Sequence, residues 1–499
     1  MNRRDLFESM AYIDSTILER SERRKRPARR PIRWWNAVAA VVAVALLLPV
    51  VHRLATYQPK KDGASNSSIA DTTTSTSETQ DAQQLEPVAL SSFARAEAEY
   101  PEMAPYVQWD DYTTLEGFDS EGYYNAYSLW EADVEAQRQE PGYADSLTSY
   151  FSSSISAFLS AQSGENRAFS PLNVYFALGM MAEFSDEAGQ QEILSLLSLP
   201  NMEALRSQAK AVWNGQYRDD GATTMRLASS LWMDEGFSLD DATLSTLAET
   251  YYASSYQGEM GSTRFNQALQ AWLNRETGNR LLNQVNDLTL NQGTVLALAT
   301  TVFYQAKWQQ EFSPALTSDA IFHAAGGDVT CDMMQGTYYG NYYWGDHFSA
   351  VGKPMENGGG TMWLVLPDEG VAVDELLADQ GTLAFLLSKG GWSQQKEMTI
   401  HLSLPRFDLT SEMDLVAGLK ALGVQAVFDG GLPLTQMPHG VRVTTDEEGV
   451  TAVAYTVMEY ESAEPEGEEI AFTLDRPFLF AITSPDGLPL FVGVVHTPC

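Results

Sequence analysis

The sequence predicts a mixed α+β domain from residue 143 to residue 499, with helices clustered in its N-terminal half and strands dominating the rest. Helices are indicated by apolar residues at helical intervals in residues 146–162. They are also indicated by Ser170 before Pro171, a helix-start pattern followed by a buried apolar run. Two continuous apolar runs, 293–308 and 361–370, indicate central strands, because each is flanked by turn residues.

The composition of the chain argues for a folded domain and against some classes of function. The chain has 499 residues, of which 44% are hydrophobic and 11% aromatic, enough for a substantial core. Its net charge of −35 divides into +8 for residues 1–61 and −43 for the remainder. Because phosphate attracts basic surfaces, the acidic body argues against nucleic acid as a partner. We find no Gly-x-Ser-x-Gly, His-Glu-x-x-His or phosphate-binding loop, so the sequence does not indicate an enzyme.

The N-terminal segment has the pattern of a membrane anchor. Residues 1–33 form a basic tail, and from Trp34 to Val51 the only polar residue is Asn36. This length is near the lower end of the 17–25 or so residues that a spanning helix needs, and the preceding basic residues follow the positive-inside rule. We therefore expect residues 1–33 in the cytoplasm, a single-pass anchor at 34–53, and the rest outside the cell. A cleaved signal peptide is the alternative, which the long, partly acidic leader disfavours.

Two further segments precede the domain. Residues 54–99 are low in complexity, rich in Ser and Thr, and predict a solvated linker. Residues 100–142 form an acidic, aromatic-rich extension, which either packs its aromatic side chains onto the domain, the interpretation we favour, or forms an adhesive patch. The cysteines Cys331 and Cys499 fit unpaired thiols better than a disulfide framework. No histidine cluster indicates a metal site, and we expect neither a metal nor another cofactor.

Specific blocks of residues carry a resemblance to a known family. In chain order they are AFSPLNVYFALGMM (168–181), WLNRETGNRLLNQV (272–285), VLALATTVFYQAKWQQEFSP (295–314), DVTCDMMQ (328–335), VLPDEG (365–370), HGVRVTTDEEG (439–449), DRPFLFAI (475–482) and LFVGVVHTP (490–498). They resemble the serpins, the serine protease inhibitors, in the family's order over residues 143–498. The resemblance implies the serpin fold with a large central β-sheet, an exposed reactive-centre loop, and a monomer that inhibits proteases. We expect a membrane-anchored member of bacterial origin.

The resemblance implies a hinge at Glu447, Glu448 and Gly449, followed by a segment able to insert into the central sheet. The remaining hinge positions are Val450, Thr451, Ala452, Val453 and Ala454. An inserting strand excludes proline and needs uncharged inward side chains. Alternation puts Val450, Ala452, Ala454, Thr456 and Met458 inward, and none is charged. The alternative is an edge strand that never moves, as in a non-inhibitory member acting as a surface binding or adhesion module.

The position of the bond that a target protease attacks stays open. Family spacing counted from Gly449 gives Ala463, and counted back from Pro477 it gives Glu466; Glu464 and Tyr460 are further candidates. Ala463 suits an elastase-like serine protease, whereas a glutamate needs a protease with a basic pocket. A cysteine protease is a second possible class of target. The glutamates of the loop favour a basic partner surface, or they merely solvate the loop.

The resemblance also assigns residues that hold the central sheet shut. His439 matches the family's sheet-gating histidine, and Ser170 belongs with it. Asn173 and Thr300 stand where the family usually has serine and asparagine, so this cluster is altered. Trp308 matches the tryptophan near the point where insertion begins.

Overall fold

The fold is known from a computed structural model, which describes a defined part of the chain. The described residues are 41–44, 88–114, 117–138, 146–160, 164–221, 223–277, 289–429, 438–450 and 468–498.

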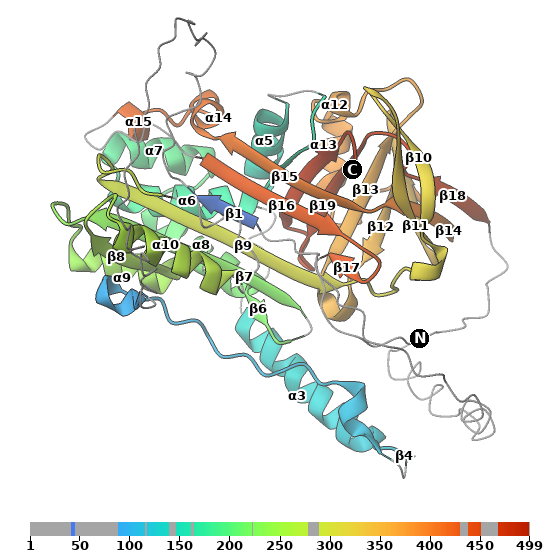
Figure 1. The fold of residues 1–499 in the computed structure, drawn as a ribbon, viewed down its shortest axis with the longest axis horizontal. Coiled ribbons are helices and arrows are strands. Elements are labelled where there is room, and N and C mark those ends of the chain that lie inside the picture. The colour runs from blue at the N-terminus through green and yellow to red at the C-terminus, as the bar shows by residue number, and fades with distance from the viewer. Residues whose placement is uncertain are drawn as a thin grey trace, which may run out of the picture. The chain divides into compact units, whose positions relative to one another are not determined.

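One large sheet, here called sheet A, contains the long strand β9. Its strand order is β15-β16-β17-β9-β7-β8-β2, with β1 also paired to β9 and β6 to β7 (Figure 1). The strands are β15 (Phe407–Asp414), β16 (Pro438–Thr445), β17 (Gly449–Val450), β9 (Leu296–Lys307), β7 (Thr224–Asp234), β8 (Ala253–Gly258), β2 (Ala94–Ala96), β1 (Val41–Val44) and β6 (Arg218–Asp219).

A second sheet, sheet B, contains the C-terminal strands. Its order is β18-β14-β11-β12-β13-β19-β20-β5, with β10 paired to β11. The strands are β18 (Glu469–Thr473), β14 (Gln395–Pro405), β11 (Gly327–Trp344), β12 (Phe348–Pro354), β13 (Thr361–Pro367), β19 (Phe478–Thr483), β20 (Pro489–Val495), β5 (Arg167–Phe169) and β10 (Ser318–Ala324). A small hairpin pairs β3 (Thr113–Thr114) with β4 (Gly117–Phe118). Cys331 is buried on β11, whereas Cys499 lies outside the described residues.

The helices mostly precede β9 in the chain, which confirms the predicted α+β class. They are α3 (Ser120–Arg138), α5 (Thr148–Leu159), α6 (Pro171–Phe184), α7 (Glu187–Leu196), α8 (Met202–Gln216), α9 (Asp241–Thr250), α10 (Thr263–Glu276), α12 (Val373–Leu376), α13 (Gln380–Leu386), α14 (Val416–Ala421) and α15 (Ala426–Asp429). Short 3-10 helices are η1 (Leu90–Ser92), η2 (Trp109–Tyr112), η3 (Pro314–Leu316) and η4 (Glu356–Gly358). The predicted helix start is found at α6, where Ser170 is the N-cap and Pro171 the first residue.

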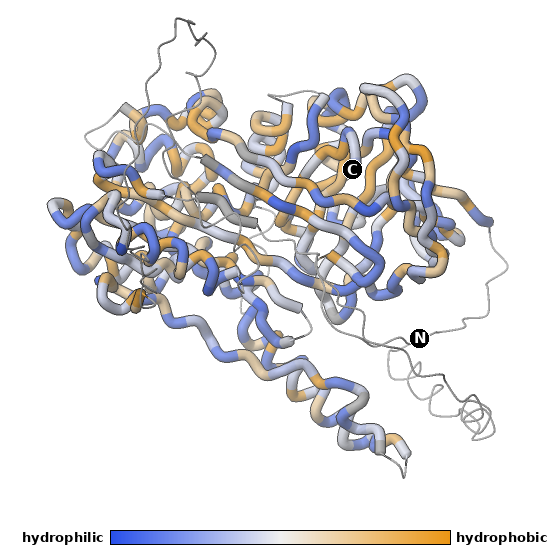
Figure 2. Tube along the Cα trace, viewed as in Figure 1, coloured by the Kyte–Doolittle hydropathy of each residue, from blue (hydrophilic) through white to orange (hydrophobic). Residues whose placement is uncertain are grey.

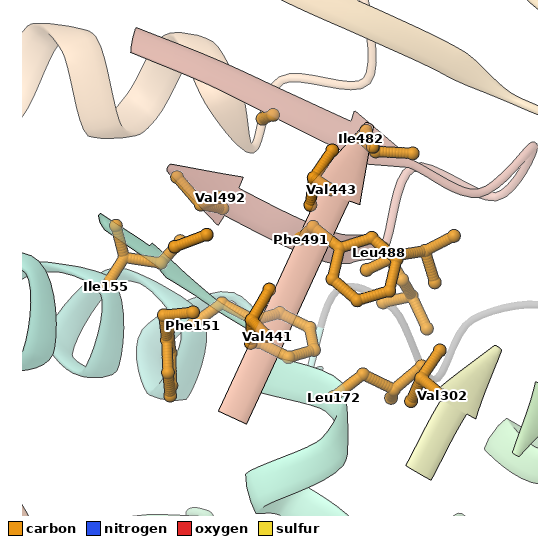
Figure 3. Packing of buried hydrophobic residues seen from close by; sticks show 14 of the residues in the cluster. Phe151, Ile155, Leu172, Val302, Val441, Val443, Ile482, Leu488, Phe491 and Val492 are labelled. Carbon is orange, nitrogen blue, oxygen red and sulfur yellow. The ribbon is translucent and has the colours of Figure 1, made fainter. Parts of the chain in front are cut away.

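The middle of sheet A, around β9, is buried on both faces. Alternate residues of β9 point to opposite sides, so Leu298 and Val302 join the main core while Ala299 and Phe303 join a second cluster under α10. The main core lies between sheet A, α6 and sheet B, and Figure 3 shows Val302, Leu172 and Phe491 within it. This burial on both faces explains why β9 is a continuous apolar run.

The segment before the domain is tied to it by aromatic side chains. β2 pairs with β8, and the ring of Phe93 lies 5.2 Å from that of Phe265. The Tyr100 ring lies 5.5 Å from Trp213, 5.6 Å from Tyr217 and 6.4 Å from Tyr252. The segment therefore adds buried surface to α8 and sheet A.

Part of the predicted membrane anchor falls within the described residues. Val41–Val44 form β1, which pairs antiparallel with β9 over Ala299–Val302. A strand of sheet A and a membrane-spanning helix are mutually exclusive placements of these residues. Among the described helices, none is both long and apolar enough to cross a bilayer. Most of 34–53 lies outside the described residues, and the anchor stays a prediction.

We expect Tyr100→Ala to lower the free energy of unfolding by about 2–4 kcal/mol, because it empties an aromatic site beside Trp213. Leu129→Ala is the control, since Leu129 is 73% exposed on α3 and its truncation should change stability by less than about 0.5 kcal/mol. Denaturant unfolding of the full chain measures both. Equal midpoints for the two variants would show that Tyr100 does not anchor the segment.

Candidate hinge and sheet-opening site

The chain makes a tight turn between β16 and β17. The Asp446 carboxylate Oδ1 accepts hydrogen bonds from the backbone N–H groups of Glu448 (3.0 Å) and Gly449 (3.1 Å), and the Asp446 N–H donates to the Gly449 carbonyl (3.1 Å). An aspartate that bonds to the backbone two and three residues ahead stabilises such a turn locally. The turn directs the following residues back along β9.

Trp308 fixes this turn to the end of β9. Its indole Nε1 donates to the Asp446 carbonyl (2.9 Å), and its backbone N–H donates to the Glu448 carbonyl (3.0 Å). Trp308 is fully buried, so both bonds are shielded from water. The structure thus places Trp308 directly against the turn that contains the predicted hinge residues.

Glu447 is a buried carboxylate with charged and neutral partners. Arg406, the residue between β14 and β15, donates from Nε to Glu447 Oε2 (2.8 Å) and also from Nη2. Thr317 Oγ1 donates to Glu447 Oε1 (2.6 Å). The Glu447 side chain is 6% exposed and that of Arg406 43%, so the pair is reachable by water from the arginine side. Loss of Arg406 would leave the Glu447 carboxylate as a poorly solvated charge without a counter-charge.

Carboxylates crowd the same end of β9. Burial raises the pKa of Asp446, and the N–H bonds from Gly449 and Glu448 only partly offset it. Burial and the Asp446 charge raise the pKa of Glu448, while Lys307 lowers it. Burial also raises the pKa of Glu311 and of Glu356, again opposed by Lys307. Within the described residues, no group of His, Cys, Asp or Glu has the geometry of a metal site.

Gly449 and Val450 occupy the entrance of the lane between β9 and β16. Gly449 pairs with Lys307, and Val450 pairs with Ala306 of β9 on one side and Thr445 of β16 on the other. A Cβ on Gly449 would lie 2.3 Å from the Ala306 carbonyl oxygen, so glycine is the residue that fits. Val450 is 2% exposed and faces the core, the orientation that the alternation predicts.

The residues predicted to gate the sheet are partly brought together. The Ser170 backbone N–H donates to His439 Nε2 (3.1 Å), and the Ser170 hydroxyl caps the Asn173 N–H (3.4 Å). Burial lowers the pKa of His439 to about 3, so the ring is neutral and accepts at Nε2. Thr300 is buried on β9 opposite Ser229, and within the described residues no hydrogen bond joins it to His439.

A lysine that the sequence analysis did not single out lies beside Trp308. Lys353, on β12, is 3% exposed and donates from Nζ to the Gln310 carbonyl (2.6 Å). Its ammonium lies 4.6 Å from the centre of the Phe312 ring and 5.9 Å from that of Trp308. Burial lowers its pKa to about 8. The buried ammonium of Lys353, on β12 of sheet B, therefore lies close to the carboxylates at this end of sheet A.

The structure does not reach every predicted site residue. Glu447, Glu448, Gly449, Val450 and Trp308 meet at one point. The hinge residues 451–454 and the reactive-bond candidates Tyr460, Ala463, Glu464 and Glu466 lie outside the described residues. Sequence reasoning missed the partners Arg406, Thr317 and Lys353, which are distant in the chain. The pattern Asp446-x-x-Gly449 was a signal for the turn itself.

We expect His439 to make the unfolding free energy fall as pH drops from about 6 to 4. Its pKa is about 3 in the fold and about 6.5 when unfolded, so in this window the unfolded state binds more protons. The hinge carboxylates with raised pKa values, such as Asp446 and Glu448, have the opposite effect on the unfolding free energy, because they bind protons more readily in the folded state. Comparison with His439→Gln isolates the histidine: the variant's slope should be smaller by about 1 kcal/mol per pH unit. Parallel slopes in denaturant titrations would refute this role.

Comparison with known proteins identifies the family. The family model described as Serpin (serine protease inhibitor) matches residues 147–498. Serpin-ZX of Arabidopsis thaliana is 25% identical over 363 residues, 67% of this chain and 92% of that protein. Alpha-1-antitrypsin of Meriones unguiculatus is 26% identical over 364 residues, 68% of this chain and 86% of that protein.

Solved structures show the same fold. The thermophilic serpin tengpin in its native state superposes with a TM-score of 0.62 at 22% identity, covering 70% of this chain and 94% of that one. Arabidopsis AtSerpin1 in its native stressed conformation superposes with a TM-score of 0.60 at 21% identity, covering 72% and 99%. Because the family model spans most of the chain and the fold agrees, this protein belongs to the serpins, a family of protease inhibitors rather than enzymes.

Proposed function

We propose that this serpin is a suicide-substrate inhibitor of serine proteases. The observation that carries the proposal is the hinge: Gly449 and Val450 already pair between β9 and β16, and an uncharged, proline-free segment follows them. A strand that has entered the lane by two residues can extend without forming a new nucleus. Trp308 and Asp446 hold the turn from which it extends.

The chemistry of the trap is ordinary proteolysis interrupted halfway. The protease serine oxygen attacks a loop carbonyl, the peptide bond breaks, and the new amine leaves with the C-terminal part of the loop. The N-terminal part stays bound as an ester. Its insertion beside β9 then carries the protease away from the geometry that water needs for attack on the ester. An insert of fourteen residues would span about 46 Å at roughly 3.3 Å per residue, enough to traverse sheet A.

The target class follows from the residues near the reactive bond. Cleavage after Ala463 suits an elastase-like protease with a small pocket, and cleavage after Glu464 or Glu466 suits one with a basic pocket. Pro465 disfavours cleavage after Glu464. Because the loop is rich in glutamate, the favoured partner has a basic surface. Cysteine proteases, which also form an acyl-enzyme, are the second class, and the inhibitor acts as a monomer.

We also propose that the N-terminal run anchors the chain, so that the serpin domain lies outside the cell, in keeping with a bacterial origin. In the anchored form, the residues of β1 leave the lane beside β9 and enter the bilayer. The support is the basic flank and the uncharged run from Trp34 to Val51.

The altered gating cluster favours one alternative, a non-inhibitory serpin that acts as a surface binding or adhesion module. Asn173 replaces the family's usual serine, and within the described residues its amide Nδ2 has no protein hydrogen-bond partner. If loop insertion releases too little free energy to displace the bound protease, the ester is hydrolysed and the protease dissociates from the cleaved chain. The next experiment separates the two functions.

We expect Ala454→Arg to convert the inhibitor into a substrate, because it brings a charge into the inserting face at a cost of several kcal/mol. Val453→Arg is the matched control, since alternation turns this side chain outward and trapping should persist. Val450 is unsuitable, because it is already buried in the uncut protein. Mixing each protein with an elastase and running a denaturing gel shows the covalent complex.

The wild-type protein and Val453→Arg should give this complex, and Ala454→Arg a cleaved chain. Cleaved wild-type protein should also melt at a higher temperature than the uncut form. Clean cleavage of the wild type by elastase-like and glutamate-specific proteases, with no rise in melting temperature, would leave the binding-module alternative. Mass spectrometry of the released peptide locates the bond.

For the anchor, we expect the full chain to stay in membranes after carbonate extraction and to dissolve in detergent. Leu46→Arg/Leu47→Arg should release it, because each central arginine costs about 2.5–3.5 kcal/mol of insertion free energy. Ser67→Arg/Ser68→Arg in the linker is the control and should remain membrane-bound. Recovery of the unmodified full chain in the soluble fraction would exclude the anchor.

A further inference from the structure

The acidic extension forms a structured arm, here defined as the described residues 100–114 and 117–138, which include β3, β4 and α3. These residues hold eight acidic side chains and one basic side chain. Glu131, Asp133 and Glu135 of α3 are exposed, and within the described residues no ion pair is formed by any of them. Figure 2 shows hydrophilic and hydrophobic residues interspersed along α3. The arm therefore presents an unneutralised negative surface.

The far end of the arm is held together by its own aromatic side chains. The Trp109 ring stacks on Phe118 at 3.6 Å between centroids and an interplanar angle of 13°. Tyr123 lies 5.1 Å from Trp109 and 5.6 Å from Phe118. Trp109 is nevertheless 39% exposed. These ring contacts hold the end of the arm in one arrangement, which would lower the ordering cost of binding a partner there.

The base of the arm is fixed to the domain at β6. Trp130 is buried, the guanidinium of Arg218 lies 5.1 Å from the centre of its ring, and Tyr106 meets the same ring edge-on at 5.0 Å. Gln137 Nε2 donates to the Tyr217 carbonyl (3.2 Å). The two ends of α3 thus have different roles: its C-terminal half docks, and its N-terminal half carries the aromatic cluster away from β6 (Figure 1).

The base of the arm lies at the hinge end of sheet A. Asp219 of β6 pairs with Thr224, and Thr224 pairs with Gln305, two residues before Lys307, the partner of Gly449. Arg218 Nη1 also donates to the Gly358 carbonyl (3.3 Å), and η4, which contains Gly358, follows Met355, the bridge partner of Trp308. The arm and the reactive loop therefore start from the same pole of the molecule.

We propose that the arm is an exosite that binds a basic surface of the target protease while the reactive loop occupies the protease's active site. This inference rests on the proposed inhibitory function. The partner's charge follows from complementarity: the arm and the loop are both acidic, so together they favour a cationic protease. A second copy of this acidic chain or an anionic membrane surface would be repelled.

The experiment neutralises three arm carboxylates in the full chain as Glu131→Gln/Asp133→Asn/Glu135→Gln. These positions lie in the C-terminal half of α3, where negative charge does not favour the helix, so folding should be preserved. The matched control Glu187→Gln/Glu235→Gln/Glu259→Gln changes the net charge equally at exposed positions. Glu235 and Glu259 follow the C-terminal ends of β7 and β8, which lie away from the end of sheet A that carries the arm. The probes are a cationic elastase and an anionic protease of the same cleavage preference.

With the cationic elastase, we expect the arm variant to associate about 3- to 10-fold more slowly at low salt, a difference that disappears near 0.5 M NaCl. The control should match the wild type, as should the number of inhibitor molecules consumed per protease. The anionic protease should not distinguish the proteins. Equal association rates of the arm variant and the control with the cationic enzyme would overturn the exosite.

A second measurement separates failure of the exosite from failure of the trap. The cationic elastase with its catalytic serine replaced by alanine forms no ester, so its equilibrium binding reports contact alone. Arm-dependent, salt-sensitive binding of this inactive form supports the exosite even where the active enzyme yields no covalent complex. Covalent complex formation with arm-independent binding would leave the trap standing and refute the exosite.

Discussion

The backbone of β9 on its side toward β16 is the constraint on which the rest of the structure depends. The other side of β9 is paired along most of its length with β7, whereas this side meets Gly449 and Val450 at one end and the four residues of β1 further along. An incompletely paired strand edge inside a sheet is a strong template for another strand. If the uncharged segment that continues from Val450 inserts as proposed, it can pair with the free positions of β9 directly, and it must displace β1 to pair with Ala299–Val302.

The polar contacts of the hinge decide where such a strand would begin. Glu447 is held by Arg406 and Thr317, and Trp308 bonds to both ends of the turn, so the chain is fixed up to Glu448 and redirected at Gly449. If the segment after Val450 inserts as proposed, it lengthens a pairing that exists and leaves the ion pair of Glu447 with Arg406 intact. The cost of removing the partner of the buried Glu447 carboxylate, several kcal/mol, is then avoided.

Sequence reasoning recovered the fold class because it is encoded locally, in the cap Ser170-Pro171, the two-sided burial of β9 and the C-terminal strands. The family motifs also grouped Trp308 with Glu447–Val450, and the structure brings Trp308 against Asp446 and Glu448, while the roles of these residues in insertion stay predictions. It did not find Arg406 or Lys353, since contacts across 41 residues or more leave no periodic signal in one chain. Nor did it show that Trp130 docks while Trp109 does not: composition counts aromatic residues but cannot say which meet Arg218.

Because the arm starts at the same end of sheet A as the reactive loop, the arm and the loop glutamates would contact a protease together. A protease held at two points dissociates more slowly than one held at either point, because the second contact forms at a high effective concentration. A loop alone must accept whatever active site fits Ala463 or its neighbours. A fixed acidic arm beside it adds a demand on a distant part of the protease surface, so proteases with the same cleavage preference can be told apart by charge. Since the arm docks through Arg218, which also contacts η4 beside Met355 and Trp308, this demand is anchored at the end of sheet A where the proposed insertion would begin.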